Sequence, residues 1–434
     1  MKNVLLMFLT VASAAGALCA KPVVSGTEID FDSGTCLLSV RYRLSEPAVV
    51  TARVYTNDVA LPVRDIRGMA GEVNRFVADA SAEHVFRWQL SRAFDAAEFD
   101  ASELKVELTA WRHDLLPDYM VVDLVCTNTV RFYETEHDIP GGLGRDGHIV
   151  NRTDRLVMRR IPAKNVRFRM GFTEAELEKY TALSDADRNG GRQHYVSFTS
   201  DYYIGVYPVT QSQSLKFCKA SPSLTGFDES PSLPMENIGY EAIRGKKADG
   251  IDYPSSSLTV GGGSFLGTLR AFTGVEFDLP TDAQWEYAAR AGSRTQLPNG
   301  LEMVGGGSSF GDANADTHCW SKAVSERYWG AGIHRPGPVG YLEPNGWGLY
   351  DVMGNVKEWC RDWYQEDISA LADNLSDPAG PASGTTRVWH GGPCLYNVVN
   401  TVLSRRGSLR PGSGEAAQLG FRLWAPGNVF CADK

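Results

Sequence analysis

Alternation of hydrophobic and polar residues dominates the first part of the chain. Residues 38–44 (Leu-Ser-Val-Arg-Tyr-Arg-Leu) alternate with a period of two, which is typical of a strand with one buried face. Residues 50–54 and 106–110 repeat the pattern, and residues 84–88 also predict a strand. Short, regularly spaced strands predict a small β-sandwich over residues 21–135, with a weak likeness to immunoglobulin-like accessory modules.

The alternation stops after a glycine-rich stretch at residues 139–147, which we interpret as part of a linker at 136–154. Residues 155–428 then form a second predicted domain, in which Trp and Gly are frequent. Long segments of this domain, such as 221–236 and 305–337, show no clear period. Segments of this kind inside a compact domain are typically functional, or are held by a ligand or a metal.

Two helices are marked by capping boxes, in which a threonine hydroxyl and a glutamine three residues later satisfy free backbone N–H groups. Thr210 opens the first helix with Gln213 as its partner, and we expect this helix to continue to Cys218. Thr281 opens the second helix in the same way, and Gly292 is a suitable C-terminal end.

The first 20 residues have the composition of a secretory signal peptide. An apolar run at residues 4–11 is followed by small residues, with Ala20 or Ala17 as the cleavage position. A buried first strand is the alternative interpretation. Cys19 lies near the cut and leaves lipid attachment open, although Leu18 before it is bulky. No other apolar run reaches the roughly 18 residues that span a bilayer. We therefore expect an exported protein: periplasmic, at the cell surface or secreted.

Charge and cysteine usage narrow the classes of partner and site. The net charge of -9 and the pI of about 5.5 argue against a nucleic-acid partner. The predicted signal is followed by seven cysteines: Cys36, Cys126, Cys218, Cys319, Cys360, Cys394 and Cys431. None forms a C-x-x-C pair, which argues against a zinc ribbon. In an exported protein Cys36 and Cys126 could form a disulfide, and the odd number leaves at least one thiol unpaired within the chain.

Four segments of the second domain occur in a fixed order with a closing segment. The four segments span residues 158–171, 203–211, 279–292 and 345–363, and the closing segment consists of residues 387–392 and 420–423. The third segment reads Leu-Pro-Thr-Asp-Ala-Gln-Trp-Glu-Tyr-Ala-Ala-Arg-Ala-Gly. The fourth begins Asn-Gly-Trp-Gly-Leu-Tyr-Asp-Val-Met-Gly-Asn-Val-Lys-Glu-Trp. From about residue 155 to residue 424 the chain therefore resembles the formylglycine-generating-enzyme (sulfatase-modifying factor) family. The resemblance implies a C-type-lectin-like fold, an α+β domain with much irregular structure behind the N-terminal all-β sandwich.

The fourth segment has the chemistry of a site for a hard cation. Asp351 and Glu358 lie seven residues apart on a glycine-containing turn, so the two carboxylates could converge on one ion. The resemblance implies calcium here, held by the side chains of Asp351 and Glu358 and the carbonyls of Gly354 and Val356. The alternative is that the two carboxylates cap turns without a metal.

The chain departs from the family after the Gly-Gly pair at residues 391–392. Formylglycine-generating enzymes continue with Ser and place two cysteines five residues apart, whose thiolates hold copper(I). Here the serine position is Pro393, and the cysteine positions are Tyr396 and Thr401. A tryptophan of the family is replaced by Lys357. Because phenol and hydroxyl oxygens are poor ligands for a soft ion, we expect neither copper nor formylglycine-generating activity.

Cys394 lies two residues before Tyr396 and could stand in for one missing thiol. It has no partner thiol five residues later, so a disulfide to Cys360 or a buried thiol is the better interpretation. An iron-dependent branch of the superfamily needs closely spaced histidines on a helix. The histidines of this chain are scattered, which argues against that branch.

The sequence thus favours a recognition or scaffold protein whose ligand is a protein, a peptide or a glycan. The variable proteins of diversity-generating retroelements are similar in this region. The predicted ligand-binding surface mixes aromatic, amide and cationic groups, and consists of Cys394, Tyr396, Asn397, Asn400, Thr401 and Arg405. Two alternatives stay open. These residues could merely pack the closing strands, or the protein could be a metal-dependent oxidoreductase of the same superfamily with an altered active site.

Overall fold

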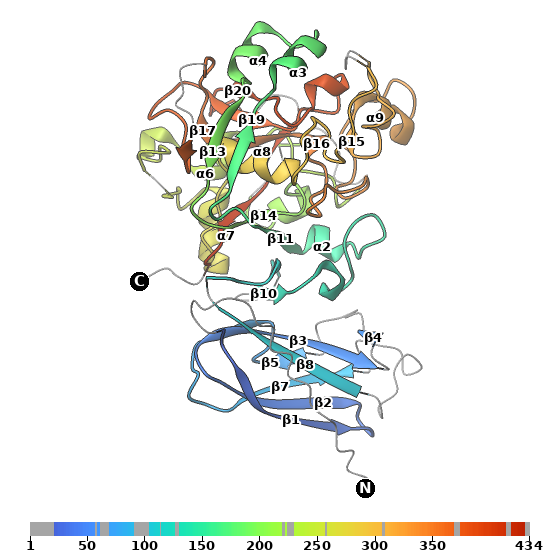
Figure 1. The fold of residues 1–434 in the computed structure, drawn as a ribbon, viewed down its shortest axis with the longest axis vertical. Coiled ribbons are helices and arrows are strands. Elements are labelled where there is room, and N and C mark those ends of the chain that lie inside the picture. The colour runs from blue at the N-terminus through green and yellow to red at the C-terminus, as the bar shows by residue number, and fades with distance from the viewer. Residues whose placement is uncertain are drawn as a thin grey trace. The chain divides into compact units, whose positions relative to one another are not determined.

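A computed structural model describes residues 21–56, 59–60, 69–90, 104–112, 114–125, 130–218, 222–223, 230–256, 258–305, 309–368, 374–413 and 418–429 (Figure 1). The predicted signal peptide with Cys19 lies outside the described residues, as do Cys126 and Cys431. The chain divides into two compact units. The first comprises Met1–Val121, Val130–Gly142 and Phe430–Lys434, and the second Val122–Thr129 and Leu143–Val429.

The first unit is built of strands, as its alternation predicts. The four strands expected from the sequence are confirmed as β2 (Leu37–Leu44), β3 (Ala48–Thr56), β7 (His84–Gln89) and β8 (Leu104–Trp111). One sheet has the order β1-β2-β7-β5, and the other has the order β4-β3-β6 with β8 paired to β3. The remaining described elements are β1 (Val24–Asp32), β4 (Val59–Ala60), β5 (Met69–Gly71), β6 (Arg75–Val77), β10 (Val130–Tyr133) and the 3-10 turn η3 (Glu136–Asp138). Strand β9 (Tyr119–Asp123) contains the boundary between the two units.

A single hydrophobic core joins the two sheets of the first unit. Val40 and Trp88 enter it from the first sheet, and Val50 and Leu104 enter it from the second. Alternate residues of β2 are buried, so the period-two pattern of the sequence is the pattern of burial. Both sheets therefore cover one core, as a sandwich requires. The likeness to immunoglobulin-like modules stays a prediction.

The second unit mixes short strands with short helices and long connections. Its strands are β11 (Arg155–Ile161), β12 (Arg167–Met170), β13 (His194–Ser197), β14 (Tyr202–Gly205), β15 (Cys319–Trp320), β16 (Met353–Gly354), β17 (Lys357–Trp363), β18 (Leu375–Ser376), β19 (Arg387–His390), β20 (Gly407–Leu409), β21 (Leu419–Gly420) and β22 (Trp424–Pro426). Its helices are α2 (Val150–Thr153), α3 (Glu174–Lys179), α4 (Asp185–Gly190), α5 (Gln211–Ser214), α6 (Tyr240–Arg244), α7 (Phe265–Thr273), α8 (Asp282–Arg290) and α9 (Lys322–Trp329), with 3-10 turns η5 (Lys247–Asp249) and η6 (Val398–Asn400). The expected α+β character is confirmed.

Helix α8 and the sheet of order β20-β19-β17-β21 form the centre of this unit. The helix packs against β12, β17 and β19, and Figure 1 shows it beside β19. Trp285 and Ala288 of the helix share one core with Cys360 of β17 and Val388 of β19. The capping box thus starts a helix that is buried along most of its length.

The helix predictions are partly confirmed. Thr281 caps α8 as expected, and the helix ends at Arg290, with Ala291 rather than Gly292 in the left-handed cap position. Thr210 also forms its capping box, but α5 ends at Ser214 and does not continue to Cys218. Within the segment 305–337, which we expected to be irregular, residues Lys322–Trp329 form α9.

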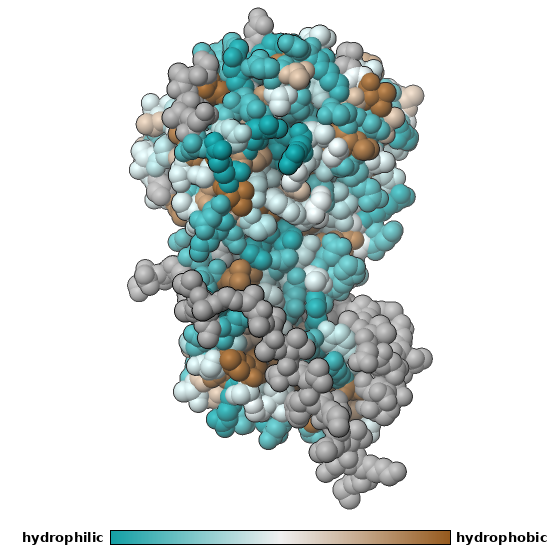
Figure 2. All heavy atoms as spheres, in the orientation of Figure 1, coloured by the Kyte–Doolittle hydropathy of each residue, from teal (hydrophilic) through white to brown (hydrophobic). Residues whose placement is uncertain are grey.

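The surface of the second unit is mainly polar on the face shown in Figure 2. Hydrophilic side chains cover most of that face, and hydrophobic ones are scattered among them. Across the described parts of the chain, the helices are too short or too polar to traverse a bilayer.

Candidate functional site

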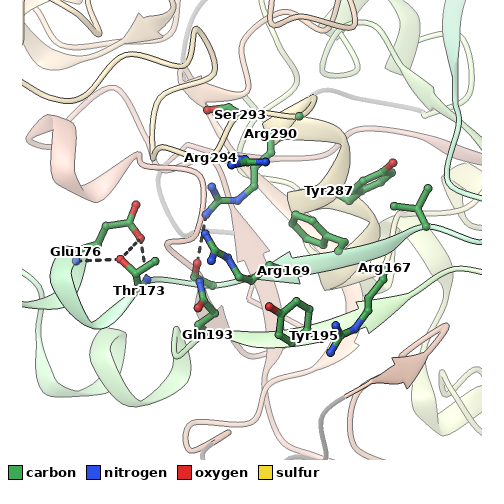
Figure 3. Close-up of a pocket in the computed structure, with 14 residues that line it drawn as sticks. Arg167, Arg169, Thr173, Glu176, Gln193, Tyr195, Tyr287, Arg290, Ser293 and Arg294 are labelled. Atoms are coloured by element: carbon green, nitrogen blue, oxygen red, sulfur yellow. Dashed lines mark hydrogen bonds between the residues drawn. The ribbon is translucent and has the colours of Figure 1, made fainter.

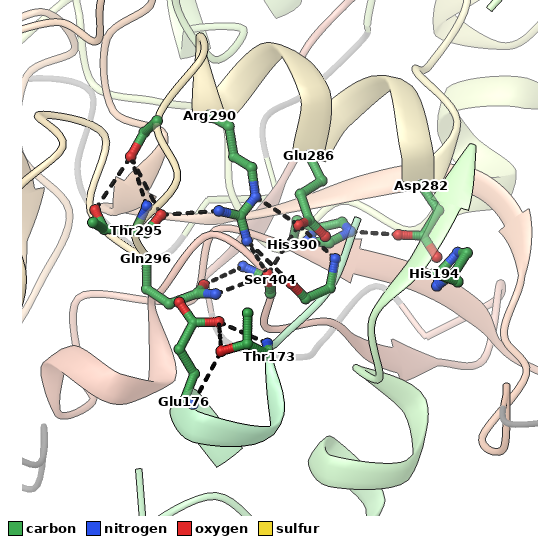
Figure 4. Close-up of polar contacts among 12 residues, drawn as sticks. Thr173, Glu176, His194, Asp282, Glu286, Arg290, Thr295, Gln296, His390 and Ser404 are labelled. Atoms are coloured by element: carbon green, nitrogen blue, oxygen red, sulfur yellow. Dashed lines mark hydrogen bonds and ion pairs between the residues drawn. The ribbon is translucent and has the colours of Figure 1, made fainter. Parts of the chain in front are cut away.

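The segment between β19 and β20 is fixed at both ends to the first turn of α8. Figure 4 shows the first of these contacts, between His390 and Asp282. His390 Nε2 lies 2.6 Å from Asp282 Oδ1, and Arg406 donates to Asp282 Oδ2. Although burial favours the neutral acid, Arg406 and His390 hold the pKa of Asp282 below its ordinary value. His390 also stacks on Trp285, with ring centroids 4.5 Å apart. One buried carboxylate therefore holds the entry and the exit of residues 391–406.

A second buried anchor holds the same segment near its end. Ser404 Oγ donates to Glu286 Oε1 over 2.9 Å, and Arg290 Nε donates to the same oxygen over 2.8 Å. The backbone N–H of Ser404 donates to Gln296 Oε1 over 3.0 Å. All four side chains are buried. Figure 4 shows the contacts around Arg290. Residues 391–406 are thereby presented from rigid elements, which is the arrangement that precise recognition needs.

The middle of the segment exposes an aromatic ring among cations. Tyr396 is 44% exposed, and the Lys357 ammonium lies 5.7 Å from the centre of its ring and 5.0 Å from that of Trp389. The Arg405 guanidinium lies 5.5 Å from the Trp389 ring and 3.3 Å from Asp187 Oδ1. Burial and the nearby charge of Arg405 lower the pKa of Lys357.

These groups define the Tyr396 surface, which consists of Lys357, Tyr396, Asn397, Asn400 and Arg405, with the buried ring of Trp389 beneath the two cations. Asn397, Asn400 and Arg405 are half-buried, so their side chains are partly accessible beside Tyr396. Cation–π contacts of this length stabilise by about 0.5–1 kcal/mol at exposed sites. The sequence indicated Tyr396, both amides and Arg405. It did not indicate Trp389 as the buried ring that supports the two cations, and it gave Lys357 only as a departure from the family.

Two predicted members of the ligand-binding surface are buried, which corrects the expectation. Cys394 and Thr401 are both 0% exposed. Cys394 Sγ lies 3.3 Å from Gln418 Oε1, and Thr401 Oγ1 donates to the carbonyl of Val398 over 2.7 Å. Thr401 Oγ1 also lies 3.2 Å from the thiol sulfur of Cys319. These two side chains support the segment from within and offer no surface to a ligand.

The buried thiols near the segment are unpaired. Cys319, Cys360 and Cys394 are free cysteines, so the disulfide between Cys394 and Cys360 is wrong and the buried-thiol alternative holds. Burial raises the pKa of Cys319 to about 12 and raises the pKa values of Cys360 and Cys394 as well. These thiols are therefore protonated at neutral pH, and a protonated thiol is neither a nucleophile nor a metal ligand.

Glu358, a predicted calcium ligand, has N–H donors at both carboxylate oxygens. Arg422 Nη2 lies 2.9 Å from Oε1 and Arg422 Nε lies 3.0 Å from Oε2. Trp285 Nε1 donates to Oε2 over 2.6 Å. All three side chains are at most 1% exposed. A guanidinium already balances this carboxylate, so its surroundings do not fit a calcium ion, which needs a shell of oxygen ligands.

Asp351 is held in a different way. It has a positive φ of 57°, its Oδ2 accepts from the Gly340 N–H over 2.8 Å, and its Oδ1 accepts from Asn355 Nδ2 over 3.1 Å. Burial raises the pKa of Asp351 to about 6. Gly354 adopts a φ of 77°, and a Cβ there would lie 2.3 Å from the Trp320 carbonyl oxygen. The turn is thus shaped by hydrogen bonds. Calcium at Asp351, Gly354, Val356 and Glu358 stays a prediction.

Comparisons with known proteins find matches to the sequence of this unit. The family model of the sulfatase-modifying factor enzyme 1-like domain matches residues 161–425. The chain is 36% identical over 254 residues to the formylglycine-generating enzyme of Thermomonospora curvata (strain ATCC 19995), a match that covers 52% of this chain and 82% of that enzyme. It is 32% identical over 151 residues to the formylglycine-generating enzyme of Mus musculus, covering 34% of this chain and 38% of that enzyme.

Among solved structures, Treponema denticola variable protein 1 aligns with a TM-score of 0.46 and 23% identity, covering 63% of this chain and 95% of that one. The family match spans more than half of the chain and includes α8, β17, β19 and the anchored segment between β19 and β20. The chain therefore belongs to the sulfatase-modifying factor enzyme 1-like (formylglycine-generating-enzyme) domain family.

Proposed function

We propose that this protein is an exported member of the family that recognises a ligand, or acts as a scaffold, through the Tyr396 surface and does not generate formylglycine. The observation that carries the proposal is the environment of the two positions at which the resemblance implies cysteines. Thr401 is fully buried and hydrogen-bonded, whereas Tyr396 is an exposed ring beside Lys357. Neither position offers sulfur, and the two side chains lie in different surroundings.

Metal chemistry supports the proposal that this protein does not generate formylglycine. Copper(I) prefers thiolate and thioether ligands, and neither a phenol nor a hydroxyl replaces them. The thiol that contacts Thr401 belongs to Cys319, and burial keeps it protonated. A single protonated thiol does not reproduce a pair of thiolates.

The composition of the Tyr396 surface supports the proposal that this protein recognises a ligand. Tyr396 supplies contact area with little loss of conformational entropy, and Asn397 and Asn400 supply adaptable hydrogen bonds. Lys357 and Arg405 add two cations beside aromatic rings, which favours a ligand with acidic or polar groups. A protein, a peptide or a glycan can present such groups, and we propose one of these classes as the ligand.

A glycan and peptide array tests the recognition. The purified chain is applied as the wild type and as Tyr396→Ala, and each ligand found is then titrated in solution. We expect specific ligands whose affinity falls about tenfold or more in the variant, because alanine removes the central ring of the surface. Tyr55→Ala is the matched control, since Tyr55 has Lys105 at 5.4 Å from its ring but lies in the first unit. No ligand, or an equal loss in both variants, would contradict the proposal.

A second experiment separates recognition from oxidoreductase chemistry. A peptide with a sulfatase-type cysteine is incubated with the protein, copper and oxygen, and its mass is followed. We expect the cysteine mass to persist. Conversion of the thiol to an aldehyde, with copper retained stoichiometrically by the protein, would favour the metal-dependent oxidoreductase instead.

A further inference from the structure

A cavity of about 470 Å³ lies between β12, β13 and the C-terminal end of α8 (Figure 3). None of its lining residues belongs to the Tyr396 surface, so it is a separate feature of the second unit. Its wall includes the rings of Phe168, Tyr195 and Tyr287, and the Phe168 and Tyr287 rings meet edge to face at 5.1 Å. Cavities for small ligands have volumes of roughly 300–1,000 Å³, so a small organic molecule fits this one.

Three exposed arginines also line the cavity. Arg167 and Arg169 come from β12, and Arg294 follows the end of α8. The Arg167 guanidinium lies 3.6 Å from the centre of the Tyr195 ring and donates to Asn374 Oδ1 over 2.5 Å, so it is held in place. Figure 3 shows Arg167 and Tyr195 on neighbouring strands at one end of the cavity.

Arg169 and Arg294 are the cations available to a ligand. Within the part of the chain that the structure describes, neither guanidinium forms an ion pair or a side-chain hydrogen bond. Arg290, which also lines the cavity, differs because it binds Glu286 and the carbonyl of Thr295 and is therefore structural. The cavity thus has two free guanidinium groups, those of Arg169 and Arg294, beside the two fixed ones of Arg167 and Arg290.

Little negative charge opposes these arginines inside the cavity. Glu176 is the one acidic residue among the lining residues. Its Oε2 accepts from the backbone N–H of Thr173 over 2.8 Å and from the Thr173 hydroxyl over 3.1 Å, in the capping box of α3. The cavity is locally positive, whereas the whole chain carries a net charge of -9. Charge concentrated in a concave site raises the local concentration of oppositely charged ligands.

We propose that this cavity binds a small ligand that carries an oxyanion on a ring. The oxyanion is a carboxylate, sulfate or phosphate, which the planar guanidinium groups of Arg169 and Arg294 can bind through paired hydrogen bonds. The ring, aromatic or sugar, packs against the aromatic wall formed by Phe168 and Tyr195. This inference goes beyond recognition by the Tyr396 surface and does not depend on it.

Titration calorimetry with four probes tests the proposal. The probes are 4-nitrophenyl sulfate, glucose 6-sulfate, inorganic sulfate and glucose, which separate an aromatic anion, a sugar anion, the anion alone and the ring alone. We expect a ring-bearing sulfate to bind at least about tenfold more tightly than inorganic sulfate, and glucose to bind least. Tighter binding of the nitrophenyl or of the sugar ester identifies the kind of ring.

Variants link this binding to the cavity. Arg169→Ala and Arg294→Ala should each weaken the binding of the better ester about tenfold, which corresponds to the loss of one charge-assisted hydrogen bond. Arg327→Ala is the matched control, because Arg327 is exposed and lies outside the cavity. Binding should also weaken with added salt. Tyr396→Ala should leave it unchanged, so this test is independent of the proposed recognition surface.

Three results would overturn the proposal. They are the absence of binding by both esters, equal affinities for the esters and for inorganic sulfate, and affinities that neither arginine substitution changes. Both arginines are exposed, so their replacement should preserve the fold, which circular dichroism checks.

Discussion

Arg422→Met tests whether Glu358 serves an arginine or a calcium ion. The Arg422 guanidinium and the Glu358 carboxylate meet at 2.9 and 3.0 Å with side chains 1% and 0% exposed. Methionine keeps much of the arginine volume and removes its charge. Arg422 and Trp285 both donate hydrogen bonds to the Glu358 carboxylate. The variant therefore leaves this carboxylate buried with only the Trp285 donor of the two.

The expected cost follows from burial. Removing one partner of a buried ion pair destabilises by about 3–5 kcal/mol, because the other charge is left uncompensated. Arg422 also donates to the carbonyls of Gly205, Val206 and Tyr350, and each carbonyl that loses its donor adds about 1 kcal/mol. We expect Arg422→Met to lower the free energy of unfolding of the second unit by at least about 4 kcal/mol.

The double variant Glu358→Gln with Arg422→Met separates the contribution of the ion pair to the free energy of unfolding from that of the hydrogen bonds to the carbonyls. It removes both charges, so its cost should fall below the sum of the single variants by about 2–3 kcal/mol, while the loss at the carbonyls stays. Urea unfolding followed by tryptophan fluorescence measures the three values. Most tryptophans, from Trp285 to Trp424, lie in the second unit and report its transition.

Arg327→Met provides a control ion pair with a similar N···O distance and a different burial. Arg327 Nη2 lies 2.8 Å from Asp316 Oδ2, but the arginine side chain is 64% exposed. Such a surface pair contributes about 0–1 kcal/mol. Equal costs for Arg327→Met and Arg422→Met, or additive costs in the double variant, would refute the reasoning. A large loss of stability on chelation by EDTA would instead support calcium at Glu358.

Three further predictions concern the same unit. Iodoacetamide at pH 8 should leave Cys319, Cys360 and Cys394 unmodified in the folded protein and should alkylate them in urea, as peptide mass spectrometry would show; modification without urea would contradict their burial. The pKa of Asp351 is raised from 3.8 to about 6 in the folded state, so between these pH values the folded protein keeps a proton on Asp351 that the unfolded chain has lost. The contribution of Asp351 to the free energy of unfolding should therefore fall as pH rises from about 4 to about 6 and stay level above. Asp351→Asn should remove that slope from the unfolding free energy, and an unchanged slope would assign it to other groups. Ser404→Ala should cost about 1–3 kcal/mol in urea unfolding, because it leaves buried Glu286 and Arg290 short of a partner, and a neutral result would show that the second anchor is dispensable.

Features encoded by neighbouring residues could be predicted from the sequence. The strands of the first unit follow from alternation, because one face of each strand enters a shared core. Helix α8 follows from its capping box, which requires only Thr281 and Gln284. Helix α9 was missed because just two of its residues, Val324 and Ser325, are buried, so its sequence carries little apolar periodicity.

Features that depend on distant segments could not be predicted. Cys319 and Thr401 are 82 positions apart, and their contact exists because β15 and η6 come together in the tertiary structure. The cavity arginines likewise come from β12 and from the turn after α8. No local pattern marks either arrangement. The resemblance directed attention to the segment 391–406, but burial of Cys394 and Thr401 depends on packing that spacing alone does not show.

The positions of the anchors explain how the exposed residues of the segment could vary while its fold is kept. Asp282 pairs with His390 and Arg406 in a buried network, where removal of one partner costs several kcal/mol. Tyr396 lies between these anchors and is exposed, and substitutions at such positions usually change stability by less than about 0.5 kcal/mol. Stability therefore constrains the ends of the segment strongly and its exposed middle weakly. The exposed side chains of the middle can therefore change without disturbing the helix and strands that hold the segment.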